Sequence, residues 1–428
     1  MDDIEFGRAL WYLRCSRFLE DSSRNSMSDG VNKVGVVGLG VMGFDIAFLY
    51  AMRGCQTFVY DASKAAMDSL AGRSEQTIER LKRRNRISDG EIESVRNGLI
   101  AAAGLKQLAR MDLVTEAVSE NAKTKLAVYQ ALREAGFAGI LTTNTSSLAR
   151  ATLLAGGIPD REKFALTHFF NPVLYTQMVE VVKGDMETTT FDTVVAFLKG
   201  LGREPVETQD ISGFVSNSIL MYYAVMALQL LQCGARIEDV DQAAKELRIL
   251  PPFVSFDSWK PSIVEDVTRV MFEIRGDEFL RSSKLLTALA KNNPKFYIDQ
   301  KPNPEIYRLV ETLNREIGAA SIKRALKTVI HAAAARVVEL GESPDIVDFV
   351  ATEGVKIPQA PLKEIDSVRA TTILKELSEL ENEMPEVPLT PPELLTAMAT
   401  EGQSFFKNDQ PNPWLISRIK SPIPHASH

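Results

Sequence analysis

Residues 34–43 read Val34-Gly35-Val36-Val37-Gly38-Leu39-Gly40-Val41-Met42-Gly43, an apolar run that enters the pattern Gly-x-Gly-x-x-Gly. The run predicts a buried strand, and the apolar segment Ile46–Met52 predicts a helix after the glycines. In this setting Gly38 permits a tight turn, Gly40 lets the backbone approach a phosphate, and Gly43 lets the helix pack closely. Because a helix N-terminus attracts negative charge, the stretch predicts a dinucleotide-binding domain. The alternative is an α/β domain that binds no cofactor, since glycine-rich turns are common.

The next predicted strand favours NAD as the dinucleotide. Residues Thr57-Phe58-Val59-Tyr60 end in Asp61, which follows Gly43 by 18 residues (61 − 43). A carboxylate there accepts hydrogen bonds from the adenosine ribose and repels a 2′-phosphate, so it disfavours NADP. Asp45 departs from the pattern, because a small residue would suit the helix start beside the phosphates better. We expect the cofactor to contact Gly38, Gly40, Val41, Met42, Gly43 and Asp61.

Strands and helices alternate from Lys33 to about Asp210, whereas long helices dominate after Gly213. Such alternation predicts a mostly parallel sheet with helices on both faces. The expected strands are Val34–Val37, Thr57–Tyr60, Leu113–Thr115, Ile140–Thr143, Phe164–His168 and Val179–Val182.

The helical half repeats itself. Three residues, Gly234, Asp241 and Pro251, recur as Gly341, Asp348 and Pro358, each displaced by 107 residues (341 − 234, 348 − 241, 358 − 251). The expected helices Ser218–Gln232 and Ile322–Glu339 begin the copies, and the stretch from Asn292 to Pro304 connects them. We therefore expect an α/β Rossmann-like doubly wound sheet domain followed by two related all-α domains, although chance also explains three matches. The expected parts are a linker helix at 1–30, an NAD-binding domain at 31–210, and helical domains at 211–300 and 315–428.

Composition sets limits on function. The 428 residues suffice for several domains, and 45% hydrophobic with 25% charged residues is ordinary for a globular protein. A net charge of −7 argues against general nucleic-acid binding. The three cysteines lack metal-ligand spacing, so we expect no metal and a reducing compartment. We expect no apolar stretch to span a bilayer, and the start Met1-Asp2-Asp3 is atypical of a secretory or transit peptide.

His168 is the candidate acid–base residue. The sequence holds four histidines, and His168 ends the apolar run that begins at Phe164, just before Phe169-Phe170-Asn171-Pro172. Proline cannot continue a β-ladder, so the pattern predicts a strand that stops at a turn. A histidine at this end of a strand is a candidate general base, although a structural histidine explains it better when it is taken alone. His331, in an alanine-rich helical run, is expected to be a packing residue.

Five further motifs follow the glycines in order. They are Glu116-Ala117-Val118-Ser119-Glu120 with Lys125, Asn144-Thr145-Ser146-Ser147-Leu148, His168-Phe169-Phe170-Asn171-Pro172, Val179-Glu180-Val181-Val182 and Gly213-Phe214-Val215-Ser216-Asn217. In type, order and spacing the set resembles the L-3-hydroxyacyl-CoA dehydrogenase family of fatty-acid β-oxidation, strongly over about residues 31–260. The layout, with residues 5–25 similar to a linker helix, resembles the dehydrogenase part of peroxisomal multifunctional enzymes of type 1. The hydratase half of those enzymes is missing from this chain, so we expect no hydratase activity.

The resemblance implies NAD-dependent oxidation of an L-3-hydroxyacyl-CoA to the 3-oxoacyl-CoA. His168 would be the general base that takes the 3-hydroxyl proton, and Glu180, twelve residues on (180 − 168), would orient the imidazole. Ser146 and Asn217 would hydrogen-bond the reacting oxygen. Taken singly, Glu180 is a surface carboxylate, and Ser146 and Asn217 are more often turn or cap residues.

The resemblance also implies contacts to both ligands. Glu120, Lys125 and Asn171 match positions near the nicotinamide ribose, although a solvated helix pair explains Glu120 and Lys125 as well. Asn144 and Ser146 complete the expected cofactor contacts. A group of basic residues lies where the family binds coenzyme A, and Thr77 and Arg84 are the nearest equivalents of the family's coenzyme A contacts. A solvated helix face explains the basic group as well. The basic residues are Lys82, Arg83, Arg84 and Arg86.

Several positions depart from the family's pattern. Ser212 replaces a proline before Gly213, and Ser218 replaces an arginine after Asn217. Three segments lack glycines that the family usually has. The resemblance places these segments where the acyl chain binds and where the domains pack, so they affect the expected chain-length preference more than the expected reaction. These segments are Leu250-Pro251-Pro252-Phe253, Asn293-Pro294-Lys295-Phe296-Tyr297 and residues 354–361.

Two other functions stay open. One is a catalytically weakened acyl-CoA- or NAD-binding homologue, and the other is a β-hydroxyacid dehydrogenase, which shares the glycine turn but depends on a lysine base. We expect an acyl-CoA partner, no nucleic acid and no membrane, and a monomer, because the helical repeat would replace the dimer contact of shorter relatives. The compartment implied is the peroxisome, but Ala426-Ser427-His428 is not the usual targeting tripeptide, so cytoplasm and mitochondrion stay open.

Overall fold

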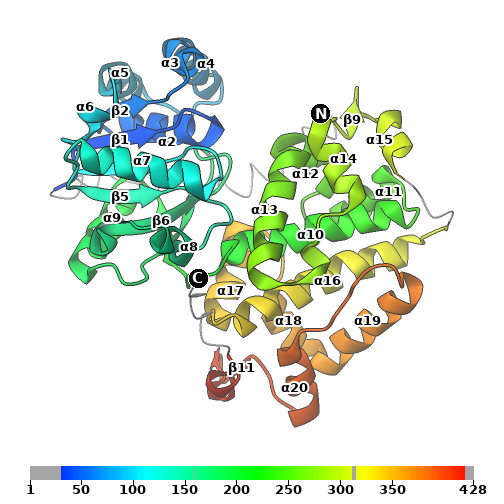
Figure 1. Cartoon of the computed structure of the whole chain (residues 1–428). Helices are drawn as coiled ribbons and strands as arrows, with labels where there is room; N and C mark the ends of the chain where they lie inside the picture. Colours follow the sequence, from blue (N-terminus) through cyan, green and yellow to red (C-terminus); the bar gives the residue numbers. More distant parts are fainter. Residues whose placement is uncertain (1–29, 159, 311–314, 420–428) are drawn as a thin grey trace. The chain divides into compact units, whose positions relative to one another are not determined.

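The computed structural model describes residues 30–158, 160–310 and 315–419. These residues fall into two compact units, one ending at Asp210 and the other beginning at Ile211. In Figure 1 the first unit is a sheet with flanking helices and the second is built from helices. The linker helix expected at 1–30 lies outside the described residues, apart from Gly30.

One sheet forms the centre of the first unit. Its strands are β1 (Lys33–Val37), β2 (Gln56–Tyr60), β3 (Leu99–Ala101), β4 (Leu113–Glu116), β5 (Ile140–Thr143), β6 (Phe164–Phe169), β7 (Met178–Val182) and β8 (Glu204–Glu207). The eight strands lie in the order β3-β2-β1-β4-β5-β6-β7-β8. All neighbours are parallel except β6 and β7, which are antiparallel. The mostly parallel sheet expected from the sequence is thereby confirmed.

The expected strands are all present in this sheet, and two further strands of the sheet were missed. Strands β4, β6 and β7 are buried at every position, as strands covered on both faces are, and apart from the polar residues near their ends or centres they are apolar. The missed strands β3 and β8 lie at the two sheet edges. Strand β3 has only three residues, too few to show a strand pattern, and β8 carries Glu204, Pro205 and Glu207 and so has no apolar run.

Helices cover the sheet of the first unit. They are α2 (Val41–Met52), α3 (Lys64–Asp68), α4 (Leu70–Lys82), α5 (Asp89–Gly98), α6 (Leu105–Leu108), α7 (Ala122–Glu134), α8 (Arg150–Ala155), α9 (Thr188–Gly200) and the 3₁₀-helix η1 (Arg161–Lys163). The helix predicted at Ile46–Met52 is the buried part of α2. The carboxyl ends of parallel strands all point the same way. The segments that follow β1, β2, β4 and β5 therefore lie together with the end of β6, along the edge of the sheet that the strand ends form.

The second unit holds two series of helices. The first is α10 (Phe214–Gln232), α11 (Ile237–Glu246), α12 (Pro252–Trp259), α13 (Pro261–Arg275), η2 (Glu278–Leu280), α14 (Lys284–Asn292) and α15 (Pro304–Leu309). The second is α16 (Ala319–Glu339), α17 (Pro344–Phe349), η3 (Val350–Gly354), α18 (Pro361–Val368), α19 (Ala370–Glu383), α20 (Glu393–Glu401) and η4 (Pro413–Ser417). Helices α10 and α16 begin the two series and pack against each other.

The membrane expectation needs a correction at α10. By length and composition this helix is apolar enough to cross a bilayer. In the structure 83% of its most apolar window is buried inside the protein. Helix α10 is therefore the core helix of its unit, and its apolar surface is covered by neighbours such as α16.

The repeat is present, but one of its three matches was wrong. Asp241 accepts hydrogen bonds from the first N–H groups of α12 (2.9 and 3.2 Å), and Asp348 does the same for α18 (2.8 and 3.1 Å). The prolines that begin these helices are Pro252 and Pro361, displaced by 109 residues (361 − 252), and not Pro251 and Pro358. The second copy has two extra residues between its aspartate and its proline, where η3 forms a wider, π-helical turn.

The stretch from Asn292 to Pro304 is more than a connector. It contains the antiparallel hairpin of β9 (Tyr297–Ile298) and β10 (Lys301–Pro302). The second copy has the same hairpin in β11 (Phe406–Lys407) and β12 (Gln410–Pro411), so the hairpin belongs to the repeated unit. Both copies lie in one compact unit, and their division into domains at 211–300 and 315–428 stays a prediction.

Candidate functional site

The glycine turn between β1 and α2 is shaped for an anion. A Cβ atom on Gly38, which has φ +97°, would lie 2.6 Å from the Ala117 carbonyl oxygen, and one on Gly43 would lie 2.0 Å from the Gly38 oxygen. A Cβ on Gly40 would meet nothing within 4 Å, so no protein contact requires glycine there. Helix α2 has no side-chain cap and no acidic residue in its first turn. The turn therefore fits a phosphate that approaches Gly40 closely.

Two side chains hold this turn. Asp61 accepts a hydrogen bond from the Leu39 N–H (2.7 Å) with one carboxylate oxygen and from the Ser63 N–H (2.7 Å) with the other. Arg73 of α4 donates to the carbonyl oxygens of Leu39 (2.7 Å) and Gly40 (3.2 Å). Arg73 was not predicted from the sequence, because nothing in a local motif connects it with a turn 34 residues earlier.

Asp45 lies in α2 behind the turn. Burial raises the pKa of Asp45 to about 6, and Arg80 and Arg73 oppose this rise. The carboxyl therefore changes charge near neutral pH in the helix that carries the turn.

His168 and Glu180 form a buried pair. They face each other across the antiparallel strands β6 and β7, and Nδ1 of His168 lies 2.9 Å from Oε2 of Glu180. The exposed fraction is 7% for the histidine side chain and zero for the glutamate. The ring of Phe170 packs against the imidazole at a centroid distance of 5.5 Å. A carboxylate on Nδ1 favours the tautomer whose Nε2 can accept a proton.

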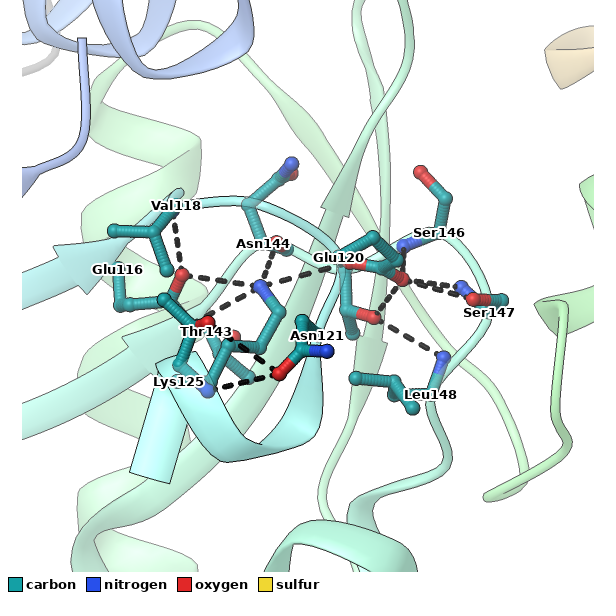
Figure 2. Close-up of polar contacts among 12 residues, drawn as sticks. Glu116, Val118, Glu120, Asn121, Lys125, Thr143, Asn144, Ser146, Ser147 and Leu148 are labelled. Carbon is teal, nitrogen blue, oxygen red and sulfur yellow. Dashed lines mark hydrogen bonds and ion pairs between the residues drawn. The ribbon is translucent and has the colours of Figure 1, made fainter. Parts of the chain in front are cut away.

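Glu120 organises the segment that carries Ser146 (Figure 2). Its Oε1 accepts hydrogen bonds from the N–H groups of Ser146 (2.8 Å) and Ser147 (2.9 Å), and from the hydroxyls of Thr145 (2.5 Å) and Ser147 (2.9 Å). Burial acts to raise the pKa of Glu120, but Lys125 and these hydrogen bonds together outweigh burial and lower it. The loop after β5 is thus fixed by a carboxylate from the loop after β4.

Lys125 and Glu116 form an ion pair with no exposed side-chain surface. Nζ of Lys125 lies 3.0 and 3.2 Å from the Glu116 carboxylate oxygens and 3.0 Å from the Asn144 carbonyl oxygen. The Asn144 side chain in turn accepts from the N–H of Phe169 (3.1 Å). Figure 2 shows Lys125 between Glu116 and Asn144. The solvated pair considered for Glu120 and Lys125 is wrong, because Lys125 is an interior residue.

The residues expected at coenzyme A lie on and after α4. Thr77 is buried in α4. Arg84 lies beyond the end of α4 and donates a long hydrogen bond to the Tyr175 hydroxyl (3.4 Å). The guanidinium of Arg86 lies 5.1 Å from the centre of the Tyr175 ring. The basic group is therefore joined to the segment after β6, through an aromatic residue that no motif indicated.

The remaining expected residues are placed as follows. Val41 is 61% exposed at the first position of α2, next to Met42. Asn171 is exposed in the turn after β6. Asn217 belongs to the second unit, in the first turn of α10. Among the residues that the structure describes, no group of three or more His, Cys, Asp or Glu side chains is arranged to hold a metal ion.

The chain is similar in sequence to known proteins. Residues 33–211 match the family described as 3-hydroxyacyl-CoA dehydrogenase, NAD binding domain, and residues 213–296 match its C-terminal domain. Hydroxyacyl-coenzyme A dehydrogenase, mitochondrial, of Rattus norvegicus is 33% identical over 224 residues, which cover 50% of this chain and 71% of the relative.

Two solved structures share the fold. The 3-hydroxybutyryl-CoA dehydrogenase of Escherichia coli K12 gives a TM-score of 0.71 at 21% identity, covering 87% of this chain and 98% of that one. The dehydrogenase part of multifunctional enzyme 1 from C. elegans gives a TM-score of 0.53 at 19% identity. The match covers 91% of this chain and 96% of that one.

The glycine turn, Asp61 and the sheet define a nucleotide-binding protein of the Rossmann class. The chain belongs to the 3-hydroxyacyl-CoA dehydrogenase family, whose members are NAD-dependent oxidoreductases. The resemblance drawn from the motifs is confirmed.

Proposed function

We propose that this chain oxidises an L-3-hydroxyacyl-CoA to the 3-oxoacyl-CoA with NAD, and that His168 is the general base. The observation that carries the proposal is the 2.9 Å contact between His168 and Glu180. This pair lies at the sheet edge where the glycine turn and the Ser146 segment also lie. A base, an oxygen ligand and a cofactor turn at one edge are the parts that alcohol oxidation requires.

The residues of the glycine turn would hold the cofactor. The backbone of Gly38, Gly40 and Val41 would face the pyrophosphate, and Asp61 would accept from the adenosine ribose. We also assign Met42, Gly43, Asn144 and Asn171 to the cofactor surface, together with Glu120 and Lys125. Bound NAD would supply the hydride acceptor for the reaction.

The proton is handled by the chain itself. Nε2 of His168 accepts the proton of the 3-hydroxyl while the C3–O bond becomes a carbonyl. The Glu180 carboxylate holds the imidazole by Nδ1 and stabilises the imidazolium that forms. Ser146 and Asn217 are the proposed hydrogen-bond partners of the reacting oxygen, as the family resemblance implies. In the reverse direction the imidazolium returns the proton to the oxygen.

The acyl-CoA partner would be bound partly through its phosphates. Thr77 and Arg84 are the proposed contacts, and Arg86 beside Tyr175 adds a second cation to the same surface. We propose a monomer, since α10 and α16 of one chain already pack together. The relatives include a mitochondrial enzyme and a multifunctional enzyme, and we keep the peroxisome as the proposed compartment, to be tested by a fluorescent fusion.

The experiment follows NADH absorbance with acetoacetyl-CoA as substrate. Consumption of NADH that depends on both acetoacetyl-CoA and the protein supports the proposal. Binding of NADH without turnover, across short and long acyl chains, would instead support the alternative of a weakened binding homologue.

A further inference from the structure

We propose that Glu116 is a positioning residue for this reaction. Through Lys125 it holds the Asn144–Ser147 segment, and through Asn144 it holds the backbone next to His168. The inference rests on the proposed function, and it adds Glu116, which is not among the proposed ligand contacts.

Glu116 is a buried carboxylate that accepts hydrogen bonds on both of its oxygens. It ends β4 opposite Thr143 of β5 and has no exposed surface. Its Oε2 accepts from the hydroxyls of Tyr129 (2.7 Å) and Thr143 (2.6 Å), and its Oε1 accepts from the Val118 N–H (2.6 Å). With Lys125 on both oxygens, the carboxylate has one fixed orientation.

Lys125 transmits this orientation to the segment after β5. Its Nζ donates to the Asn144 carbonyl oxygen and lies 3.6 Å from Glu120, which binds Ser146 and Ser147 (Figure 2). The two ends of the Asn144–Ser147 segment are therefore held by the two glutamates, with Lys125 between them.

Asn144 connects the same network to the base. Its side-chain oxygen accepts from the N–H of Phe169, the residue that follows His168. Three hydrogen-bonded links thus lead from Glu116 through Lys125 and Asn144 to the backbone beside His168. A shift of this segment would move Ser146 and His168 relative to each other, and misplacement of reacting groups by about 1 Å lowers rates up to about 100-fold.

The burial of Glu116 argues for positioning rather than for ligand contact. Its side chain is fully buried in the ion pair with Lys125, so Glu116 acts through Lys125 and Asn144 rather than by touching a ligand itself. A buried ion pair is poor evidence for added stability, because apolar side chains of the same size often stabilise as well. What the pair adds is one defined arrangement of the strand ends.

The test compares Thr143→Val with Thr143→Ser. Valine has the shape of threonine but no hydroxyl, so it removes one hydrogen bond to Glu116, whereas serine keeps it. We expect Thr143→Val to lower kcat about tenfold with the NADH Kd changed by less than about twofold, and Thr143→Ser to keep kcat. Tyr129→Phe removes the other hydroxyl and should lower kcat similarly. Glu116→Gln is the stronger variant, with about a 100-fold loss expected.

Asp112→Asn is the matched control. Asp112 precedes β4 at the opposite end from Glu116 and accepts from the N–H groups of Asn32 and Lys33 (both 2.9 Å). Its loss should lower the melting temperature and leave kcat near the wild-type value. Wild-type kcat in folded Glu116→Gln and Thr143→Val, or a kcat loss in Asp112→Asn equal to theirs, overturns the inference.

A second readout does not depend on turnover. Amide hydrogen exchange at Ser146 and Ser147 should be faster in Glu116→Gln than in the wild type, and unchanged in Asp112→Asn. Unchanged exchange in Glu116→Gln also overturns the inference. An inactive wild type contradicts the proposed function instead, and the exchange result then decides the role of Glu116 separately.

Discussion

Nδ1 of His168 lies 2.9 Å from Oε2 of Glu180 because the two residues are directly opposed on antiparallel strands. Directly opposed residues project from the same face of a sheet, so the reversal of β7 brings a carboxylate against the end of β6. A register slip of one residue would turn the glutamate to the other face. The pairing of β6 with β7 is therefore part of the chemistry of the site.

Removing either member of the pair should slow turnover strongly. We expect His168→Gln and Glu180→Gln each to lower kcat by about two orders of magnitude or more, since the base or its orientation is lost. NADH affinity, measured by fluorescence titration, should stay near the wild-type value in both. Wild-type kcat in Glu180→Gln would contradict the role given to that residue.

Glu120 should stabilise the fold in a pH-dependent manner. Its pKa is lowered in the folded state, so its contribution is present above the ordinary value of 4.5 and is lost as pH falls through the lowered pKa. We expect Glu120→Gln to reduce the free energy of unfolding by roughly 1–3 kcal/mol at about pH 7 and by much less at about pH 3. Urea unfolding at the two pH values measures this, and an equal loss at both would contradict it.

The effect of Asp45 on stability should depend on pH in the opposite direction. Its pKa rises from 3.8 to about 6 on folding, so ionisation of this carboxyl destabilises the folded chain as pH rises across that window. We expect Asp45→Asn to stabilise the protein by roughly 1–3 kcal/mol above about pH 7 and to change little below about pH 4. Thermal unfolding across this range checks the sign. Destabilisation by Asp45→Asn at about pH 7 would be the contrary result.

Light scattering tests the proposed monomeric state. Helices α10 and α16, one from each copy, already pack against each other within one chain, so a second chain is not needed to cover them. We expect the mass of a monomer at micromolar concentration, and the mass of a dimer would count against the proposal.

The sequence predicted the parts of the site that lie in continuous segments. The glycine turn, Asp61 and the β6 strand that ends near His168 each belong to one apolar or glycine-rich run, and local patterns of this kind determine strands and turns. Glu180 was found only through the resemblance, because its partner lies on another strand.

Contacts between distant segments were not predictable in the same way. Arg73 reaches the glycine turn from α4, and Tyr175 meets Arg84 from the segment after β6. Lys125 looked like one member of an exposed helical pair, because the spacing of charges does not indicate which face of α7 is buried. The one available signal was Glu116, a carboxylate at the end of a buried strand, which requires a buried partner.

The internal repeat of the helical half was also predicted only in part. Gly234 and Asp241 were matched correctly with Gly341 and Asp348, because α11 and α17 begin in the same register. The proline match failed because two extra residues in the second copy change the displacement from 107 to 109 (348 − 241 and 361 − 252). A fixed period cannot follow such an insertion.

The most direct measurement is NADH oxidation with 3-oxoacyl-CoA substrates of short, medium and long chains, for the wild type and His168→Gln. We expect the wild type to turn over at least one chain length, and His168→Gln to bind NADH equally well but to be about 100-fold slower. Measurable NADH binding without turnover of any chain length, or equal rates for both proteins, would contradict the role of His168 as the base.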